Sequence, residues 1–205
     1  MQSDKFLLRE FVELKYDQTA IREQIEAKKP ITLSGCFQRA NSLNANKRIY
    51  PRNILQREIT NYMKLVKENR AVGELDHPDT SVVELKNASH IVRDLWWEGD
   101  DVMGKLEVLN TPNGKILQSL LESNVQVGIS SRGVGSLKKD GEKNIVEDDF
   151  LLIALDCVAD PSTSGAFLVK ENKVLDDNYL NNFTKQDKLN RILNNILEAS
   201  NRSAA

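Results

Sequence analysis

The stretch Val125-Gln126-Val127-Gly128-Ile129-Ser130-Ser131-Arg132-Gly133 holds the most informative pattern of this 205-residue chain. Its apolar residues alternate with small or polar ones, as in a β-strand, where successive side chains point to opposite faces. If the apolar residues face a core, Ser131 shares their side, and Ser130 lies on an opposite, open face with Arg132. A serine on an open strand face is a candidate nucleophile when a base reaches it.

The chain contains two histidines, His77 and His90, so one of them must be the base for such a serine. His77 lies in a polar, turn-rich loop between Asp76 and Pro78, whereas His90 opens a strand in an apolar stretch. Taken alone, each histidine is more often structural than catalytic. His77 is the better candidate because loops hold reactive groups exposed on a rigid scaffold.

Asp156 is the acid that the sequence singles out, because it lies within the apolar run 151–158, where a buried carboxylate is costly unless paired. One interpretation is a strand-edge aspartate that bonds backbone amides. The other is an acid that receives the imidazole N–H and stabilises the imidazolium. The residues alone leave both open, with Asp76, Asp79 and Asp94 as alternative acids.

The residues beside Ser130 suggest support for the charge that develops during acyl transfer. Gly133 and Gly135 allow close backbone approach, which suits an oxyanion site made of main-chain N–H groups. Arg132 is either a solvated cation or a helper on the oxyanion side, and Ser131 is a further supporting residue.

Composition narrows the function classes. The formal net charge is −2, so no long-range field attracts nucleic acid or an anionic membrane, and no apolar run is long enough to span a bilayer. Cys36 and Cys157 are expected to be buried free thiols of a reducing compartment. Two scattered cysteines and two histidines do not resemble a zinc site, and we expect neither a metal nor a cofactor.

Several strands with interspersed helices, lacking strict βαβ alternation, predict an α+β fold with a small, mainly antiparallel β-barrel. The segments 31–37, 91–97, 102–109, 125–133 and 149–158 are expected strands, whereas 6–16 fits neither period cleanly. Helices are expected at 19–29, 51–69 and after Thr111-Pro112, with a polar loop at 38–48 and a turn-rich loop at 73–80. The domain division is an N-terminal segment 1–30, a main domain 31–170, and a polar tether with an amphipathic tail helix at 171–205.

Five segments, in this order, carry a resemblance to a known family. They are Asn46-Lys47-Arg48-Ile49-Tyr50-Pro51, Gly73-Glu74-Leu75-Asp76-His77-Pro78, Asp94-Leu95-Trp96-Trp97-Glu98-Gly99-Asp100-Asp101-Val102, Gly128-Ile129-Ser130-Ser131-Arg132-Gly133 and Asp156-Cys157-Val158-Ala159-Asp160-Pro161-Ser162. Together they resemble the prohead core proteases of tailed bacteriophages, relatives of the herpesvirus maturational protease (assemblin). The resemblance covers about residues 31–169.

The resemblance implies a serine endopeptidase built on a small β-barrel flanked by helices. It places His77 as general base and Ser130 as nucleophile. In the herpesvirus enzymes the third member is a second histidine, but here no histidine follows Ser131, and the corresponding step reaches Asp156. The chain therefore departs from Ser-His-His toward Ser-His-Asp.

The resemblance also implies substrates and a place of action. Family members work inside the immature capsid in the host cytoplasm, where they cleave scaffold or core proteins, the major capsid protein and their own termini. Phage members cut after Glu with an aliphatic residue two positions earlier, which makes Glu10 and Glu198 candidate self-cleavage sites. The herpesvirus relatives suggest a homodimer.

Two other functions compete with this interpretation. The first is a non-enzymatic capsid-assembly or scaffold protein that keeps the fold, with the amphipathic tail packing on a scaffold. The second is an unrelated serine esterase, but this chain lacks the Gly-x-Ser-x-Gly turn that the common hydrolase fold requires. Loss of proteolysis on replacing His77 or Ser130 distinguishes a protease from a scaffold.

Overall fold

The structure, a computed structural model, describes residues 5–78 and 81–159. Helices and strands alternate irregularly along them. In chain order they are β1 (Lys5–Glu13), α1 (Gln18–Glu26), β2 (Thr32–Arg39), β3 (Arg48–Ile49), α2 (Arg52–Lys67), β4 (Val72–Glu74), the 3-10 turn η1 (Leu85–Asn87), β5 (Ala88–Glu98), β6 (Asp101–Val108), α3 (Pro112–Glu122), β7 (Val127–Asp140), β8 (Lys143–Val146) and β9 (Leu151–Ala159). The mixed α+β prediction is confirmed.

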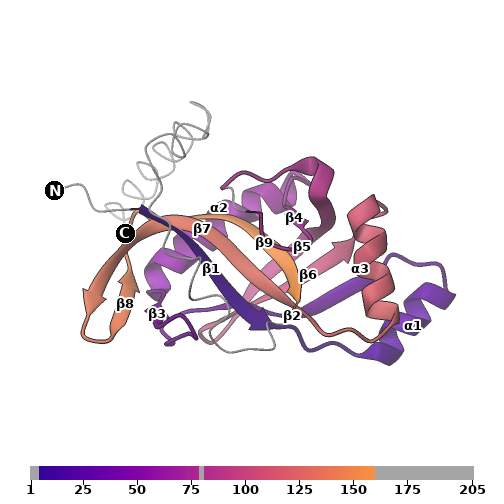
Figure 1. The fold of residues 1–205 in the computed structure, drawn as a ribbon, viewed down its shortest axis with the longest axis horizontal. Coiled ribbons are helices and arrows are strands. Elements are labelled where there is room, and N and C mark those ends of the chain that lie inside the picture. The colour runs from indigo at the N-terminus through magenta and orange to yellow at the C-terminus, as the bar shows by residue number, and fades with distance from the viewer. Residues whose placement is uncertain (1–4, 79–80, 160–205) are drawn as a thin grey trace, which may run out of the picture. The chain divides into compact units, whose positions relative to one another are not determined.

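Strand β7 organises the first sheet because it is long enough to pair with different partners along its length (Figure 1). Its first half lies between β1 and β9, both antiparallel to it. Its second half pairs with β8, which in turn pairs in parallel with the short β3. The serine pair therefore lies on a strand that is bonded on both sides.

The second sheet has the strand order β2-β6-β5-β4. The predicted hairpin is confirmed: β5 and β6 are antiparallel and joined through Gly99 and Asp100. Gly99 has a φ of +59°, a left-handed conformation that glycine adopts without steric cost.

The barrel prediction needs a correction, since the described strands form two sheets instead of one closed barrel. The first sheet ends at β1 and the second at β2, and no ladder among the described residues joins these two strands. Elsewhere the sheets meet at one isolated parallel bridge between Leu75 and Cys157. A barrel needs closure at every seam, and here the strand pairing stops at β1 and β2.

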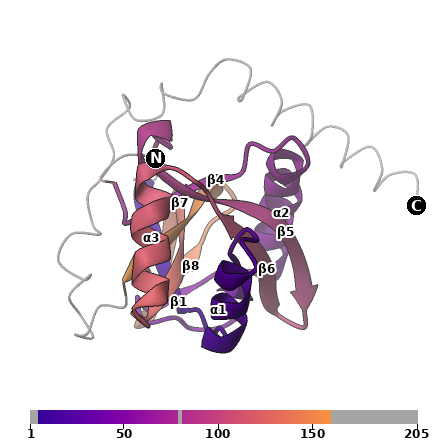
Figure 2. The same cartoon turned by 90° about the vertical axis from the view of Figure 1, so that its right-hand side faces the viewer.

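The helices cover the sheets with apolar stripes, and Figure 2 shows α2 and α3 on opposite sides of the strands. The stripe of α2 buries Ile54, Leu55, Ile59, Tyr62 and Val66, as its spacing predicts. Helix α3 begins as expected, because the Thr111 side chain caps it by accepting a hydrogen bond from the Gly114 amide at 3.0 Å, with Pro112 in the first turn.

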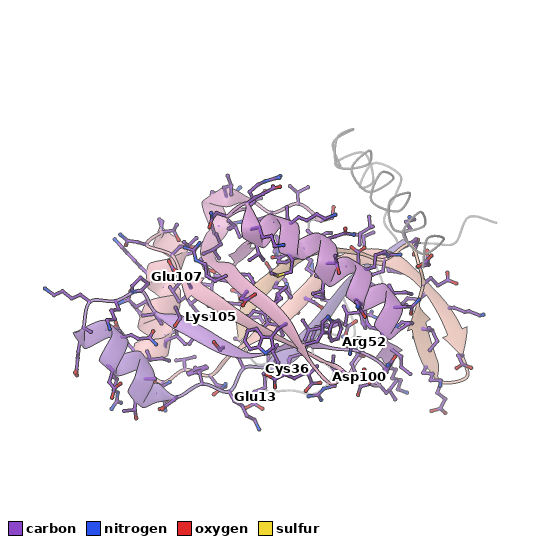
Figure 3. All side chains as sticks on the ribbon, turned by 180° about the vertical axis from the view of Figure 1, so that it is seen from behind. Glu13, Cys36, Arg52, Asp100, Lys105 and Glu107 are labelled. Carbon is purple, nitrogen blue, oxygen red and sulfur yellow. The ribbon has the colours of Figure 1, made fainter. Side chains whose placement is uncertain are left out.

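The start of α2 is attached to the hairpin turn. The Arg52 guanidinium stacks 3.5 Å from the centroid of the Trp97 ring and pairs with Asp100 at 3.2 Å, and Figure 3 shows Arg52 and Asp100 close together. Trp97 therefore has a partner within the protein, so its position needs no bound ligand to explain it.

Two expected loops are partly strand, and one ambiguous segment becomes a strand. Residues 73 and 74, expected in a loop, belong to the strand β4, because this segment pairs with β5. The segment 6–16, which fits neither period, overlaps strand β1, so the N-terminal segment 1–30 contributes a strand to the first sheet. Residues 38 and 39, expected in a loop, belong to β2. The tether and tail predicted at 171–205 lie outside the described residues.

Candidate active site

Strand pairing places Ser130 directly across from Asp156. In the β7–β9 ladder the Cα partners are Ser130 with Asp156 and Arg132 with Ala154, and in the β1–β7 ladder Phe11 is opposite Ser130. Directly opposed residues of an antiparallel pair share a face, so Ser130, Arg132 and Asp156 lie on one side of the sheet. The register places Ser130 and Ser131 on opposite faces of the sheet, as the sequence alternation predicts.

The prediction that the Ser130 face is open was wrong. Ser130 is 1% exposed and Arg132 is fully buried. Pro78 and Val82, which lie between β4 and η1, cover part of this face, because the Arg132 guanidinium donates to the Val82 carbonyl at 3.2 Å and Arg9 donates to the Pro78 carbonyl at 2.7 Å. The residue pattern cannot show this cover, since it comes from a distant part of the chain.

His77 reaches the site because the chain after β4 is fastened to β9. The Asp76 amide donates to the Cys157 carbonyl at 2.9 Å, and the Glu74 amide donates to Asp156 Oδ1 at 3.1 Å. Asp76 has a φ of +63°, a turn conformation that aspartate tolerates better than most residues. Beyond this turn, His77 Nδ1 lies 3.1 Å from Asp156 Oδ2. The structure thus places the His77 ring against the carboxylate of Asp156, the residue directly across the ladder from Ser130.

The Asp156 carboxylate is fully buried and saturated with donors. Oδ1 accepts from the Glu74 amide and, at 3.3 Å, from Arg132; Oδ2 accepts from Arg132 Nε at 2.8 Å and faces His77. Burial alone would raise the pKa of Asp156, but the hydrogen bond with His77 and the Arg132 cation outweigh it, so that pKa lies below its usual value. Asp156 is therefore an ionised acceptor. It fits both sequence interpretations at once, because it bonds a backbone amide and an imidazole.

His90 has a different surrounding from His77. It is fully buried, its Nε2 lies 2.9 Å from the Leu155 carbonyl, and its Nδ1 lies 2.9 Å from the Ser89 hydroxyl. Burial lowers the pKa of His90, so the ring is neutral, with Nε2–H donating to the carbonyl. Gly73 leaves room for this ring, since a Cβ there would lie 2.3 Å from His90 Nε2. Both ring nitrogens are occupied, by Ser89 and by the Leu155 carbonyl, so neither is available to act as a base for Ser130.

The three expected oxyanion residues have other partners in the structure. Ser131 lies on the opposite face, where its hydroxyl accepts from Gln38 Nε2 at 2.7 Å. Arg132 binds Asp156 and Glu74, and Gly133 packs against Phe150, whose ring would lie 2.4 Å from an added Cβ. The backbone of this part of β7 is paired on both sides, which directs its amides into the ladders.

The alternative acids do not approach the imidazole in the same way. Asp94 is exposed on β5, where its carboxylate accepts the Leu95 amide at 2.9 Å, and Asp76 is exposed in the turn before His77. Asp79 lies outside the described residues.

One of the two candidate self-cleavage sites, Glu10, is inaccessible in the folded chain. Glu10 lies within β1, is 2% exposed, and its carboxylate accepts from Arg48, Tyr50, Asn44 and Asn46. Cleavage after Glu10 would require β1 to leave β7. Glu198 lies outside the described residues.

Glu74 is a polar residue of the site to which the sequence pattern assigns no role. It is fully buried, and its Oε2 accepts from Arg132 at 2.8 Å while its Oε1 accepts from the Glu84 amide at 2.6 Å. The available signal was a glutamate between apolar neighbours in a strand-like segment. Its partner is 58 residues away, so sequence alone could not identify it.

A cavity of about 710 Å³ lies at the unpaired seam between β1 and β2. Glu13 and Cys36, both labelled in Figure 3, are on its wall, as are Glu10 and Gln38. Ser130, His77 and Asp156 do not line it. The cavity is therefore separate from the three candidate catalytic residues.

Among residues 5–78 and 81–159, no group of three or more His, Cys, Asp or Glu side chains is arranged to hold a metal ion. No helix in the same part of the chain is long and apolar enough to cross a membrane. Cys36 and Cys157 are free thiols; Cys157 is buried as expected, whereas Cys36 is only partly buried.

Comparison with known proteins gives consistent matches. The model of the family described as prohead core protein serine protease matches residues 9–178. The prohead core protein protease of Enterobacteria phage T4 is 36% identical over 143 residues, which is 66% of this chain and 66% of the length of that relative. The solved structure of the bacteriophage T4 capsid assembly protease matches with a TM-score of 0.66 and 28% identity, covering 77% of this chain and 99% of that one.

Proposed function

This chain belongs to the prohead core protein serine protease family, and from that premise we propose that it is a serine endopeptidase with Ser130 as nucleophile, His77 as general base and Asp156 as the orienting acid. One observation carries the assignment: His77 Nδ1 lies 3.1 Å from an Asp156 carboxylate that is directly opposite Ser130 in the β7–β9 ladder.

The contacts define the protonation states that the reaction needs. With Nδ1–H donated to the Asp156 carboxylate, a neutral His77 presents Nε2 as the base. The Ser130 hydroxyl attacks the scissile carbonyl and gives its proton to Nε2, and Asp156 stabilises the imidazolium. The imidazolium then protonates the leaving amine, which leaves an acyl-enzyme ester. Water, deprotonated by His77, hydrolyses that ester and restores Ser130.

The substrates in this proposal are scaffold or core proteins and the major capsid protein of an immature prohead, inside which the enzyme acts in the host cytoplasm. The names of the matched T4 proteins, a prohead core protease and a capsid assembly protease, support this choice. We also propose that the protein forms a homodimer and is related to the herpesvirus maturational protease, because the five sequence segments resemble this group of enzymes.

Cleavage after Glu, including self-cleavage, is the finer part of the proposal. The burial of Glu10 and the pairing of β1 with β7 argue that this bond resists cleavage in the folded chain. Self-processing at Glu198 is therefore expected first, and at Glu10 only after β1 separates from the sheet.

The test is co-expression with candidate capsid and scaffold proteins, followed by mass spectrometry of all chain termini. Wild type is expected to yield new termini after Glu, and Ser130→Ala and His77→Ala none. Identical termini in wild type and Ser130→Ala would refute the protease. Altered assembly without proteolysis in all three would favour a scaffold protein.

A further inference from the structure

Two carboxylates share one guanidinium beneath the candidate active site. Arg132 contacts Asp156 through Nε at 2.8 Å and Glu74 through a terminal nitrogen at 2.8 Å, and all three side chains are fully buried. The three side chains come from β4, β7 and β9. A buried ion pair is neutral, but this trio carries a formal charge of −1.

That extra charge matters for a histidine base. If Arg132 were paired with Asp156 alone, the pair would be neutral, and an imidazolium forming at His77 would add an uncompensated positive charge to a buried site. With Glu74 present, Arg132 is compensated by one carboxylate, and the other remains available to the imidazolium. The Glu84 amide holds Glu74 in place through Oε1, and Glu74 Oε2 in turn holds the guanidinium that donates to Asp156.

We propose that Glu74 is a positioning residue of the active site, which acts through Arg132 to orient Asp156 and to supply the negative charge that stabilises the His77 imidazolium. This inference rests on the proposed function of His77 as base. Glu74 itself contacts neither His77 nor Ser130 in any described hydrogen bond.

Other charged or titratable groups lie around the cluster of Asp156, Arg132 and Glu74 or along the chain that carries His77, and they must stay constant in a test. They are Arg9 on β1, Tyr62 on α2, Asp76 in the turn, Glu84 before η1, His90 on β5, and Cys157 beside Asp156 on β9. Burial raises the pKa of Glu74, whereas the Glu84 amide and Arg132 oppose that effect. The isosteric substitution Glu74→Gln removes one charge and leaves this environment in place.

Titration of the His77 ring by NMR tests the charge directly, in a Ser130→Ala background that prevents self-cleavage. The chain has two histidines, so the second signal, from buried His90, reports whether the fold is intact. In Glu74→Gln the midpoint of the His77 titration is expected to fall by roughly one pH unit, because a nearby negative charge has been lost. No shift would overturn the proposal.

The matched control is Glu10→Gln, which neutralises a carboxylate that is paired with Arg48 at 2.9 Å and is also buried, on the Ser131 face of the first sheet. It should move the midpoint by less than about 0.2 unit, and a shift as large as that of Glu74→Gln would contradict the proposal. Glu74→Asp keeps the charge, so its midpoint should stay near wild type even if Glu74→Gln fails to fold. A large shift in Glu74→Asp would also overturn the idea.

Activity gives the second readout in the chain with Ser130 intact. Glu74→Gln should lower kcat by about tenfold, because a shift of one pH unit in the His77 midpoint corresponds to a tenfold change in the stability of the imidazolium. The acid limb of kcat/KM should move to lower pH, and KM should stay unchanged. If the NMR shift occurs but wild type cleaves nothing, the proposed protease function fails while the coupling of Glu74 to His77 stands.

Discussion

The two faces of the first sheet each carry a buried carboxylate beside β7, and the two carboxylates accept the same number of hydrogen bonds but differ in one partner. On the Ser130 face, Asp156 has four donors, and one of them is the His77 imidazole. On the Ser131 face, Glu10 also has four donors, none of which loses or gains a proton readily near neutral pH.

The comparison shows why burial of an acid does not by itself indicate catalysis. Both carboxylates satisfy the rule that buried charges are paired. Only the one beside an imidazole is connected to a group that accepts and releases a proton during a reaction. Two adjacent serines thus have different surroundings because a strand alternates its faces.

The largest expected contrast is between the serines themselves. Ser130→Ala should lower kcat/KM by at least about 10⁴-fold, because the nucleophile is lost. Ser131→Ala removes the acceptor for Gln38 and should cost about 1 kcal/mol of stability, with activity within about tenfold of wild type. Cleavage assays on both variants check this, and an equal loss in both would mean that the two faces are not functionally distinct.

Replacing the acid on each face is the second contrast. Asp156→Asn should reduce kcat by about 10³–10⁴-fold with the fold retained, since the base loses its orienting carboxylate. Glu10→Gln should leave kcat per folded molecule nearly unchanged. Single-turnover kinetics and circular dichroism measure the two effects. Near-normal turnover in Asp156→Asn would remove it from the triad and return attention to Asp76, Asp79 and Asp94.

The Ser131 face should matter most for stability. Glu10→Ala leaves Arg48 buried without its carboxylate and should lower the free energy of unfolding by about 3–5 kcal/mol. Glu68→Ala breaks an exposed pair with Arg70 and should change the free energy of unfolding by less than about 1 kcal/mol. Urea denaturation in the Ser130→Ala background compares them. Equal losses would mean that the Glu10 cluster does not stabilise the sheet.

The smallest expected effect concerns His90, which lies beside Leu155 and Cys157 on the Ser131 side of β9. Its pKa is lowered in the folded state by burial, whereas an unfolded chain titrates near the usual value of about 6.5. Below that pH the unfolded state binds the additional proton, so the free energy of unfolding falls as pH decreases.

At pH 5.5 this loss should reach about 1.4 kcal/mol relative to pH 7.5, as long as the folded ring stays neutral. Urea denaturation of Ser130→Ala and of Ser130→Ala/His90→Gln at the two pH values measures this loss. The change in the free energy of unfolding between the two pH values should be smaller in the double variant. An unchanged pH dependence would show that His90 does not titrate on unfolding.

Much of the local structure was predictable because its causes are local. The Thr111 cap, the apolar stripe of α2 and the hairpin at Gly99 follow from residues a few positions apart. The ambiguous segment 6–16 became a strand only because β7 supplies its partner, and 72–74 because β5 does. The barrel prediction was wrong because closure depends on the geometry at both sheet edges, which no local pattern records.

The site divides in the same way. The alternation around Ser130 determined which serine shares a face with Arg132, and the presence of two histidines limited the base to two candidates. Only the tertiary structure decided that His77 meets Asp156, that His90 is occupied by Ser89 and Leu155, and that Glu74 joins the cluster. The physical reason is distance along the chain: side-chain alternation is set by neighbouring residues, whereas the contacts of His77 with Asp156, of His90 with Leu155 and of Glu74 with Arg132 and Asp156 join segments 58 to 82 residues apart.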